Sequence, residues 1–219
     1  MQRVMQKIGR PIRKRKEVFG LKKRQEIQNR PAIRLIFALY YLGLVLGALY
    51  ASAQSGKQES YLYYYVNGFL ERHTNGSFLS VFSLSFLALL GMHLFLFLCS
   101  FACFGMPFIL LFALLRGISG GVIGAFLYLE YGGRGILFQV LILLIPTVIQ
   151  SLELLWFASH TLKSSAKMFQ HTMLRHAGAG ALNPEDTLQD FVLFATIGMS
   201  GAILEGVLSM LFGPVFGIV

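Results

Sequence analysis

The apolar positions of this 219-residue chain are gathered into long runs that short polar stretches separate. Five of these runs come close to the twenty or so residues that a helix needs to cross the hydrocarbon core of a membrane. We predict spanning helices at about 35–53, 78–104, 107–128, 135–158 and 191–212. The pattern therefore predicts an all-α fold, a polytopic membrane helix bundle of about five transmembrane helices.

The division of the chain follows from the same pattern. Residues 1–34 form a basic tail, and residues 35–219 form the transmembrane bundle. The second and third spans are separated at Gly105-Met106-Pro107, because proline ends the preceding helix and favours the start of the next. This connection is predicted to be very tight.

Charge gives the expected orientation of the bundle. Twelve of the nineteen Lys and Arg residues lie in the 1–34 tail, with only Glu17 and Glu26 against them. Such a tail predicts a cytoplasmic N-terminus and contact with anionic lipids rather than nucleic acid. Five crossings then place the C-terminus outside. Only 13% of the residues are charged, about half of what soluble domains carry, so no separate soluble domain is indicated.

The first span has an alternative interpretation. Ala51-Ser52-Ala53 resembles a signal-peptidase site that follows a positive leader and an apolar run. The basic region is longer than that of an ordinary signal peptide, and the apolar run is long enough to span. We favour a retained helix.

The segment 60–77, between the first two spans, predicts an external amphipathic helix. Its apolar residues follow the spacing of one helical face: Leu62, Tyr65, Val66, Phe69 and Leu70. An aromatic helix beside a span is expected to lie in the membrane interface, where tyrosine is favoured. The alternative is that this face is a ridge on which an external partner docks.

Three charged residues fall inside the predicted spans. Arg116 lies near the middle of the third span, Glu153 deep in the fourth and Glu205 inside the fifth. A central arginine costs roughly 2.5–3.5 kcal/mol on insertion scales, so it normally faces protein or water and has a partner. We expect one or both glutamates to pair with Arg116 as a structural link. The alternative is a proton or ion relay through the same groups.

Small residues recur at helical spacing and predict close helix contacts. The strongest candidates lie in the first and third spans: Gly43, Gly47, Gly117, Gly120, Gly121 and Gly124. Small residues mark helix interfaces in lipid, because they let two backbones approach closely. The cluster in the third span lies beside Arg116, which favours a packing role for that helix.

No motif in the sequence indicates catalysis. We find no phosphate-binding Gly-Lys-Ser/Thr loop, no His-Glu-x-x-His zinc motif and no Gly-x-Ser-x-Gly nucleophile turn. The two cysteines, Cys99 and Cys103, are too few for a disulfide framework or a metal site. We therefore expect no catalytic residues, no cofactor and no metal, and a protein that is not an enzyme.

Four stretches together resemble a known family. They are GLVLGA at Gly43–Ala48, YYYVNGFLER in the external segment, GMPFILLFALLRGISGGVIGAFLYLEYGGRGIL from Gly105, and LEGVLSMLFGP in the last span. In these stretches the chain resembles stage II sporulation protein M of endospore-forming bacteria, from about Leu35 onward. One departure is that Pro146 is followed by TVIQSLE, without the histidine found at this place in wider relatives.

The resemblance implies a non-enzymatic role. Members of that family are multi-span proteins of the mother-cell membrane around the forespore. They act with stage II sporulation proteins D and P, two enzymes that degrade the cell wall during engulfment. The resemblance thus implies an integral membrane scaffold that recruits or retains peptidoglycan-degrading proteins. The alternative from the residues alone is a small transporter or permease subunit that uses Arg116, Glu153 and Glu205.

Overall fold

The computed structural model of the chain describes residues 31–54, 61–173 and 184–216. These residues are almost entirely helical, and no strand occurs among them. The elements are an N-terminal helix (Pro31–Gln54), α2 (Tyr61–Asn75), α3 (Phe78–Phe101), α4 (Gly105–Phe138), the π-helix η1 (Gln139–Leu143), α5 (Leu144–Met173) and α6 (Pro184–Phe216). The predicted all-α bundle is confirmed.

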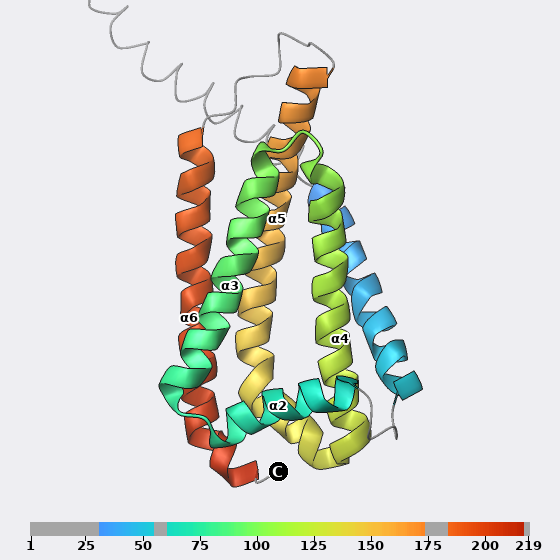
Figure 1. Cartoon of the computed structure of the whole chain (residues 1–219), viewed down its shortest axis with the longest axis vertical. Helices are drawn as coiled ribbons and strands as arrows, with labels where there is room; N and C mark the ends of the chain where they lie inside the picture. Colours follow the sequence, from blue (N-terminus) through green and yellow to red (C-terminus); the bar gives the residue numbers. More distant parts are fainter. Residues whose placement is uncertain (1–30, 55–60, 174–183, 217–219) are drawn as a thin grey trace, which may run out of the picture.

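Within the described residues, four helical segments are long and apolar enough to cross a membrane. They are Pro31–Gln54, Phe78–Phe101, Gly105–Gln170 and Thr187–Phe216. The third has 66 residues and contains a sharp turn at Gly132, so α4 and α5 run in opposite directions along the bundle (Figure 1). This segment therefore supplies two passes, and the chain is a multi-pass membrane protein. Which side of the membrane each terminus faces stays a prediction.

The turn between α4 and α5 depends on glycine. Gly132 has φ 53° and ψ −128°, a conformation that side chains with a Cβ rarely adopt. Three residues later, a Cβ on Gly135 would collide with the carbonyl group of Leu127. The chain thus changes direction at Gly132 and then continues through η1 into α5.

The second and third spans are joined as tightly as predicted, although the second ends earlier. The predicted limit was residue 104, but α3 ends at Phe101 because Ala102 adopts an extended conformation. The amide of Gly105 donates to the Ala102 carbonyl and starts α4. At the same end of the bundle, α5 ends later than the predicted residue 158, and α6 begins earlier than the predicted residue 191. A contact of 2.8 Å between His160 Nδ1 and Asp190 Oδ2 links these two extensions.

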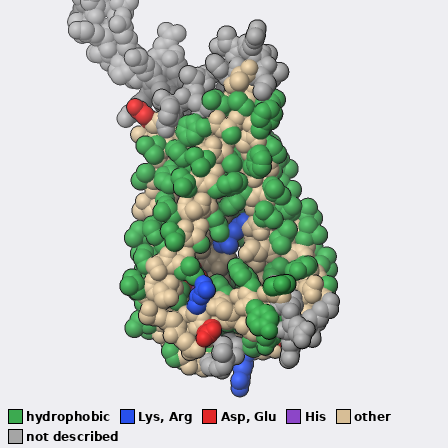
Figure 2. All heavy atoms as spheres, viewed as in Figure 1, with side chains coloured by type: hydrophobic (Ala, Val, Ile, Leu, Met, Phe, Trp, Pro, Cys, Tyr) green, Lys and Arg blue, Asp and Glu red, His purple; other side chains and the backbone are tan. Residues whose placement is uncertain are grey.

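Two clusters of buried side chains form the core. One lies toward the α3–α4 connection and contains Leu96, Ile109 and Phe157. The other lies at the opposite end of the bundle, which we name the α2 end, and contains Val66, Phe126, Phe138 and other residues. Apolar side chains also cover much of the outer surface (Figure 2), as expected of helices that face lipid.

Helix α2 lies across one end of the bundle rather than along it (Figure 1). It meets the other elements there, close to the α4–α5 turn and the end of α6. The Tyr131 hydroxyl near that turn donates to Asn67 Oδ1 at 2.7 Å. A helix is thus present between the first two spans, as predicted, and it is held against the bundle. That it lies outside the membrane stays a prediction.

The predicted interface ridge on α2 requires a correction. Val66 and Leu70 are fully buried, and Phe69 is half-buried, whereas Tyr65 is 64% exposed. The side chain of Leu62 lies outside the described residues. The buried members pack against apolar side chains of the spanning helices. The helical periodicity was right, but Val66 and Leu70 cover the bundle, and only Tyr65 of the described members is exposed.

Candidate functional site

A cavity of about 530 Å³ lies inside the α2 end of the bundle. The N-terminal helix, α2, α3, α4, η1, α5 and α6 all contribute to its walls. Figure 2 shows a hollow on this face of the molecule, with basic side chains in and below it. Figures 1 and 2 share one view, and the hollow of Figure 2 lies between the positions of α3 and α4 in Figure 1. The cavity, which residues of both helices line, thus opens sideways between two spanning helices.

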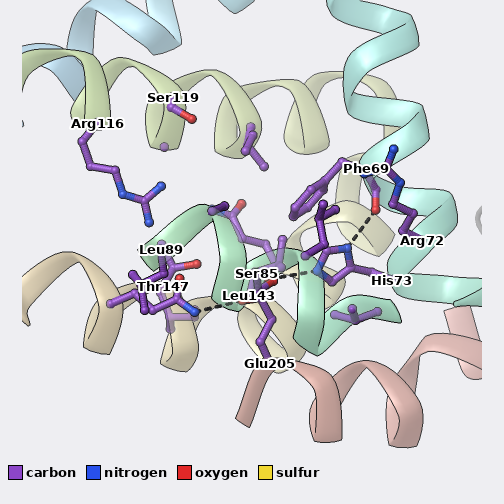
Figure 3. Close-up of a pocket in the computed structure, with 18 of the residues that line it drawn as sticks. Phe69, Arg72, His73, Ser85, Leu89, Arg116, Ser119, Leu143, Thr147 and Glu205 are labelled. Carbon is purple, nitrogen blue, oxygen red and sulfur yellow. Dashed lines mark hydrogen bonds and ion pairs between the residues drawn. The ribbon is translucent and has the colours of Figure 1, made fainter. Parts of the chain in front are cut away.

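Arg116 extends from α4 into this cavity (Figure 3). The side chain is half-buried, and its Nε atom is buried without a hydrogen-bond partner. Within the described part of the chain, no acidic side chain forms an ion pair with Arg116. An unpartnered guanidinium inside a spanning helix is costly and calls for an explanation.

Glu205 borders the same cavity but is already engaged. Its Oε1 lies 2.9 Å from His73 Nε2, and its Oε2 accepts a hydrogen bond of 3.0 Å from Gln150 Nε2. All three side chains are buried. Figure 3 shows His73 and Glu205 directed at each other from α2 and α6. This contact links the crossing helix to the last span.

Glu153 has a different partner and a different location. Its Oε2 lies 3.0 Å from His93 Nε2, between α5 and α3, and both residues are buried. Its Oε1 has no hydrogen-bond partner. Gly198 on α6 makes room for this carboxyl group, because a Cβ there would lie 2.6 Å from Oε1. Glu153 does not line the cavity.

The hydrogen positions in the two histidine–glutamate pairs follow from their geometry. The Nδ1 atom of His73 lies 2.8 Å from the Phe69 carbonyl, and that of His93 lies 2.9 Å from the Leu89 carbonyl. A carbonyl oxygen only accepts, so each Nδ1 carries a hydrogen. Each Nε2 then faces a carboxyl oxygen, and a hydrogen bond there needs one more hydrogen, on either the ring or the carboxyl group.

Each pair is therefore electrically neutral as a whole. With the hydrogen on the ring, the pair is an imidazolium and a carboxylate. With the hydrogen on the carboxyl group, both partners are uncharged. In either form neither pair has a net charge with which to compensate Arg116, and each carboxyl group contacts a histidine instead. The expected Arg116–glutamate pairing is wrong for this reason.

His73, His93 and Gln150 are the site residues that sequence reasoning missed. The sequence did contain a signal for His93, which is an ionisable residue inside an apolar span. Such a residue is expected to have a polar partner, and the same argument was applied to Arg116. His73 and Gln150 had weaker signals. His73 lies in a polar stretch after the apolar face of α2, and Gln150 is a lone amide three residues before Glu153.

The predicted glycines lie mainly at one helix contact. Gly43 and Gly47 of the N-terminal helix pack against the α4 backbone, where added Cβ atoms would collide with the carbonyl groups of Leu114 and Ile118. Gly117 and Gly121 are blocked in the same way by the carbonyls of Tyr40 and Leu44. Close backbone contact of this kind drives helix association in lipid.

The two remaining glycines face side chains instead. A Cβ on Gly120 would lie 3.3 Å from Leu44 Cδ2, and one on Gly124 would lie 2.8 Å from Gln139 Nε2. Both Gly120 and Gln139 line the cavity. The glycine-rich face of α4 thus serves the contact with the N-terminal helix and also leaves space beside Arg116.

The side chains that line the cavity are suited to holding a ligand. Among the residues that the structure describes, no three His, Cys, Asp or Glu side chains are close enough to hold a metal ion. The cavity instead combines guanidinium, amide and hydroxyl donors with apolar walls. Searches of protein-family models, curated proteins and solved structures find no match to this chain.

Proposed function

We propose that the protein is a non-enzymatic integral membrane scaffold that recruits or retains peptidoglycan-degrading proteins. The sequence resemblance to stage II sporulation protein M suggests the setting, forespore engulfment in the mother-cell membrane, and the partners, stage II sporulation proteins D and P. The observation that carries the proposal is the exposed tyrosine face of α2. The basic 1–34 tail, of which residues 1–30 lie outside the described residues, would contact anionic lipids.

The exposed tyrosines of α2 suit protein binding, and two of them, Tyr64 and Tyr65, also line the cavity. Tyr61, Tyr64 and Tyr65 are 94%, 68% and 64% exposed on this helix, while Val66 and Leu70 fix its other side to the bundle. Exposed tyrosines offer large contact areas at a small entropic cost, and they are enriched at binding hot spots. Because α2 is already fixed to the bundle, its tyrosines can bind a partner without a further loss of backbone conformational entropy.

The transporter alternative has less support from the geometry. The cavity reaches Arg116 and Glu205 from the α2 end but does not include Glu153. Toward the α3–α4 connection, the core is closed by packed apolar side chains such as Leu96, Ile109 and Phe157. A transport pathway needs polar access from both sides, so a cavity with one closed end favours the scaffold.

Deletion of the gene in the native cells tests the engulfment role. In cells induced to sporulate, we expect the mother-cell membrane to stop migrating around the forespore, as seen by fluorescence microscopy. Normal migration in the deletion strain, or a host that forms no forespore, would contradict this role.

A second experiment tests the binding face. The triple variant Tyr61→Ser, Tyr64→Ser, Tyr65→Ser should lose co-purification with protein D or P while accumulating normally in the membrane. The matched control is Tyr128→Ser, which removes an exposed tyrosine from α4. Equal capture by the triple variant and the control would show that α2 is not the docking surface.

A further inference from the structure

We propose that the cavity at the α2 end binds an anionic amphiphile from the bilayer, with its acidic headgroup on Arg116 and its hydrocarbon chain leaving between α3 and α4. The inference concerns a ligand site and does not depend on the scaffold function. It rests on the charge of the cavity, its apolar walls and the direction in which it opens.

The charge balance of the cavity is positive. Apart from three tyrosines, its ionisable lining residues are Arg72, Arg116, His73 and Glu205. The His73–Glu205 pair is neutral as a whole, so two guanidinium groups remain without a compensating charge in the cavity wall. An acidic headgroup would supply that charge and an acceptor for the unpartnered Nε of Arg116.

Polar side chains continue from Arg116 toward α2. Ser119 lies one turn along α4, and Gln139 and Thr147 also line this part of the cavity. In Figure 3, Arg116 and Ser119 project from α4 into the space that faces Arg72 and His73. These donors are suited to the several oxygen atoms of a phosphate or carboxylate group.

The remaining walls are apolar and match a hydrocarbon chain. Among them are Leu84, Leu89, Met92, Ile123, Leu144 and Val148. Leu84, Leu144 and Val148 are also 46–47% exposed, so they lie where the cavity meets the surface of the spanning helices. A lipid would reach this apolar mouth by lateral diffusion in the bilayer.

The size of the cavity is compatible with such a ligand. A volume of about 530 Å³ falls within the range of pockets that bind small molecules. The sideways opening allows the rest of a chain to stay among neighbouring lipids. A phosphate on an acidic glycerophospholipid and the carboxylate of a fatty acid share this chemistry, and the two sources are separated by experiment.

The test uses native mass spectrometry of the full chain, stripped of lipid in nonionic detergent. The probes are phosphatidylglycerol, phosphatidylcholine with the same acyl chains, and oleate. We expect phosphatidylglycerol, oleate or both to bind at least about tenfold more tightly than phosphatidylcholine, because the choline cation cancels the charge of the phosphate and would lie near two guanidinium groups. Which anion binds more tightly identifies the source.

Variants locate the binding at the cavity. Arg116→Gln should weaken binding of the preferred anion about tenfold or more, and Arg116→Lys should restore part of it. Arg134→Gln is the matched control, because Arg134 is an exposed arginine of the same helix that does not line the cavity. The basic tail is present in every variant, so its attraction for anionic lipids cancels.

A third variant keeps the test decisive if Arg116→Gln does not fold. Ala88→Trp adds a large side chain at an exposed position of the cavity wall and leaves the arginine in place. It should weaken binding by a similar factor. Equal binding of phosphatidylglycerol, oleate and phosphatidylcholine to the wild type would overturn the proposal, and so would undiminished anion binding by Ala88→Trp or by folded Arg116→Gln.

Discussion

The two buried histidine–glutamate pairs are chemically alike but lie in different surroundings. In each, the histidine donates from Nδ1 to a carbonyl four residues earlier and contacts the glutamate through Nε2. The His93–Glu153 pair is packed inside the apolar core, with the rings of Phe157 and Phe191 against His93. The His73–Glu205 pair instead borders a cavity and has a third partner, Gln150.

The comparison shows how one arrangement serves two purposes. A neutral pair lets two polar side chains cross an apolar core without a net charge, and between α3 and α5 it does only this. At the α2 end the same neutrality leaves Arg116 uncompensated, which gives the cavity its positive charge. The difference predicts that removing the two histidines has unequal consequences.

The largest effect is expected for His93→Leu. This change leaves Glu153 buried with no partner on either oxygen, and breaking a buried pair costs about 3–5 kcal/mol. The midpoint of thermal unfolding in detergent, followed by circular dichroism, should fall steeply. The control is the double variant His93→Leu, Glu153→Leu, which removes both polar groups and should recover most of the loss. A double variant as unstable as the single one would mean that packing, not the pair, holds this position.

A smaller loss is expected for His73→Leu. Glu205 keeps its hydrogen bond from Gln150 and lies beside a cavity that can admit water, so the cost is about 1–3 kcal/mol, typical of one lost charged hydrogen bond. Because His73 also attaches α2 to α6, limited proteolysis should cut near α2 sooner than in the wild type. A loss equal to that of His93→Leu would remove the distinction between the two sites.

The fold was predictable from the sequence to the extent that it depends on single residues. Runs of apolar residues indicate spans wherever they pack, and glycines at i and i+4 indicate close contact whichever helix is the neighbour. The partner of Arg116 was not predictable, because it depends on which faces of α3, α5 and α6 meet. The histidines decide that question by neutralising both glutamates. Likewise, the apolar face of α2 has the same periodicity whether membrane or protein covers it.

Arg116 provides a third comparison, between paired and unpaired charge. Arg116→Met should stabilise the lipid-free protein by about 1 kcal/mol, because it removes a half-buried charge that has no partner and keeps the apolar part of the side chain. The measurement is thermal unfolding of the lipid-stripped protein, with Arg134→Met as the exposed control. A clear destabilisation would show that the arginine already has a favourable interaction within the protein.

The smallest effect is expected on the outer face of α2. Tyr64 is 68% exposed, so Tyr64→Ser should change the free energy of unfolding by no more than about 0.5 kcal/mol, as surface substitutions usually do. Leu70→Ser, on the buried face of the same helix, should cost several times more because it places a hydroxyl among apolar side chains. Thermal unfolding of the two variants side by side separates the faces. A large loss for Tyr64→Ser would mean that the tyrosines are structural, and the exposed face of α2 would then no longer be free to bind a partner.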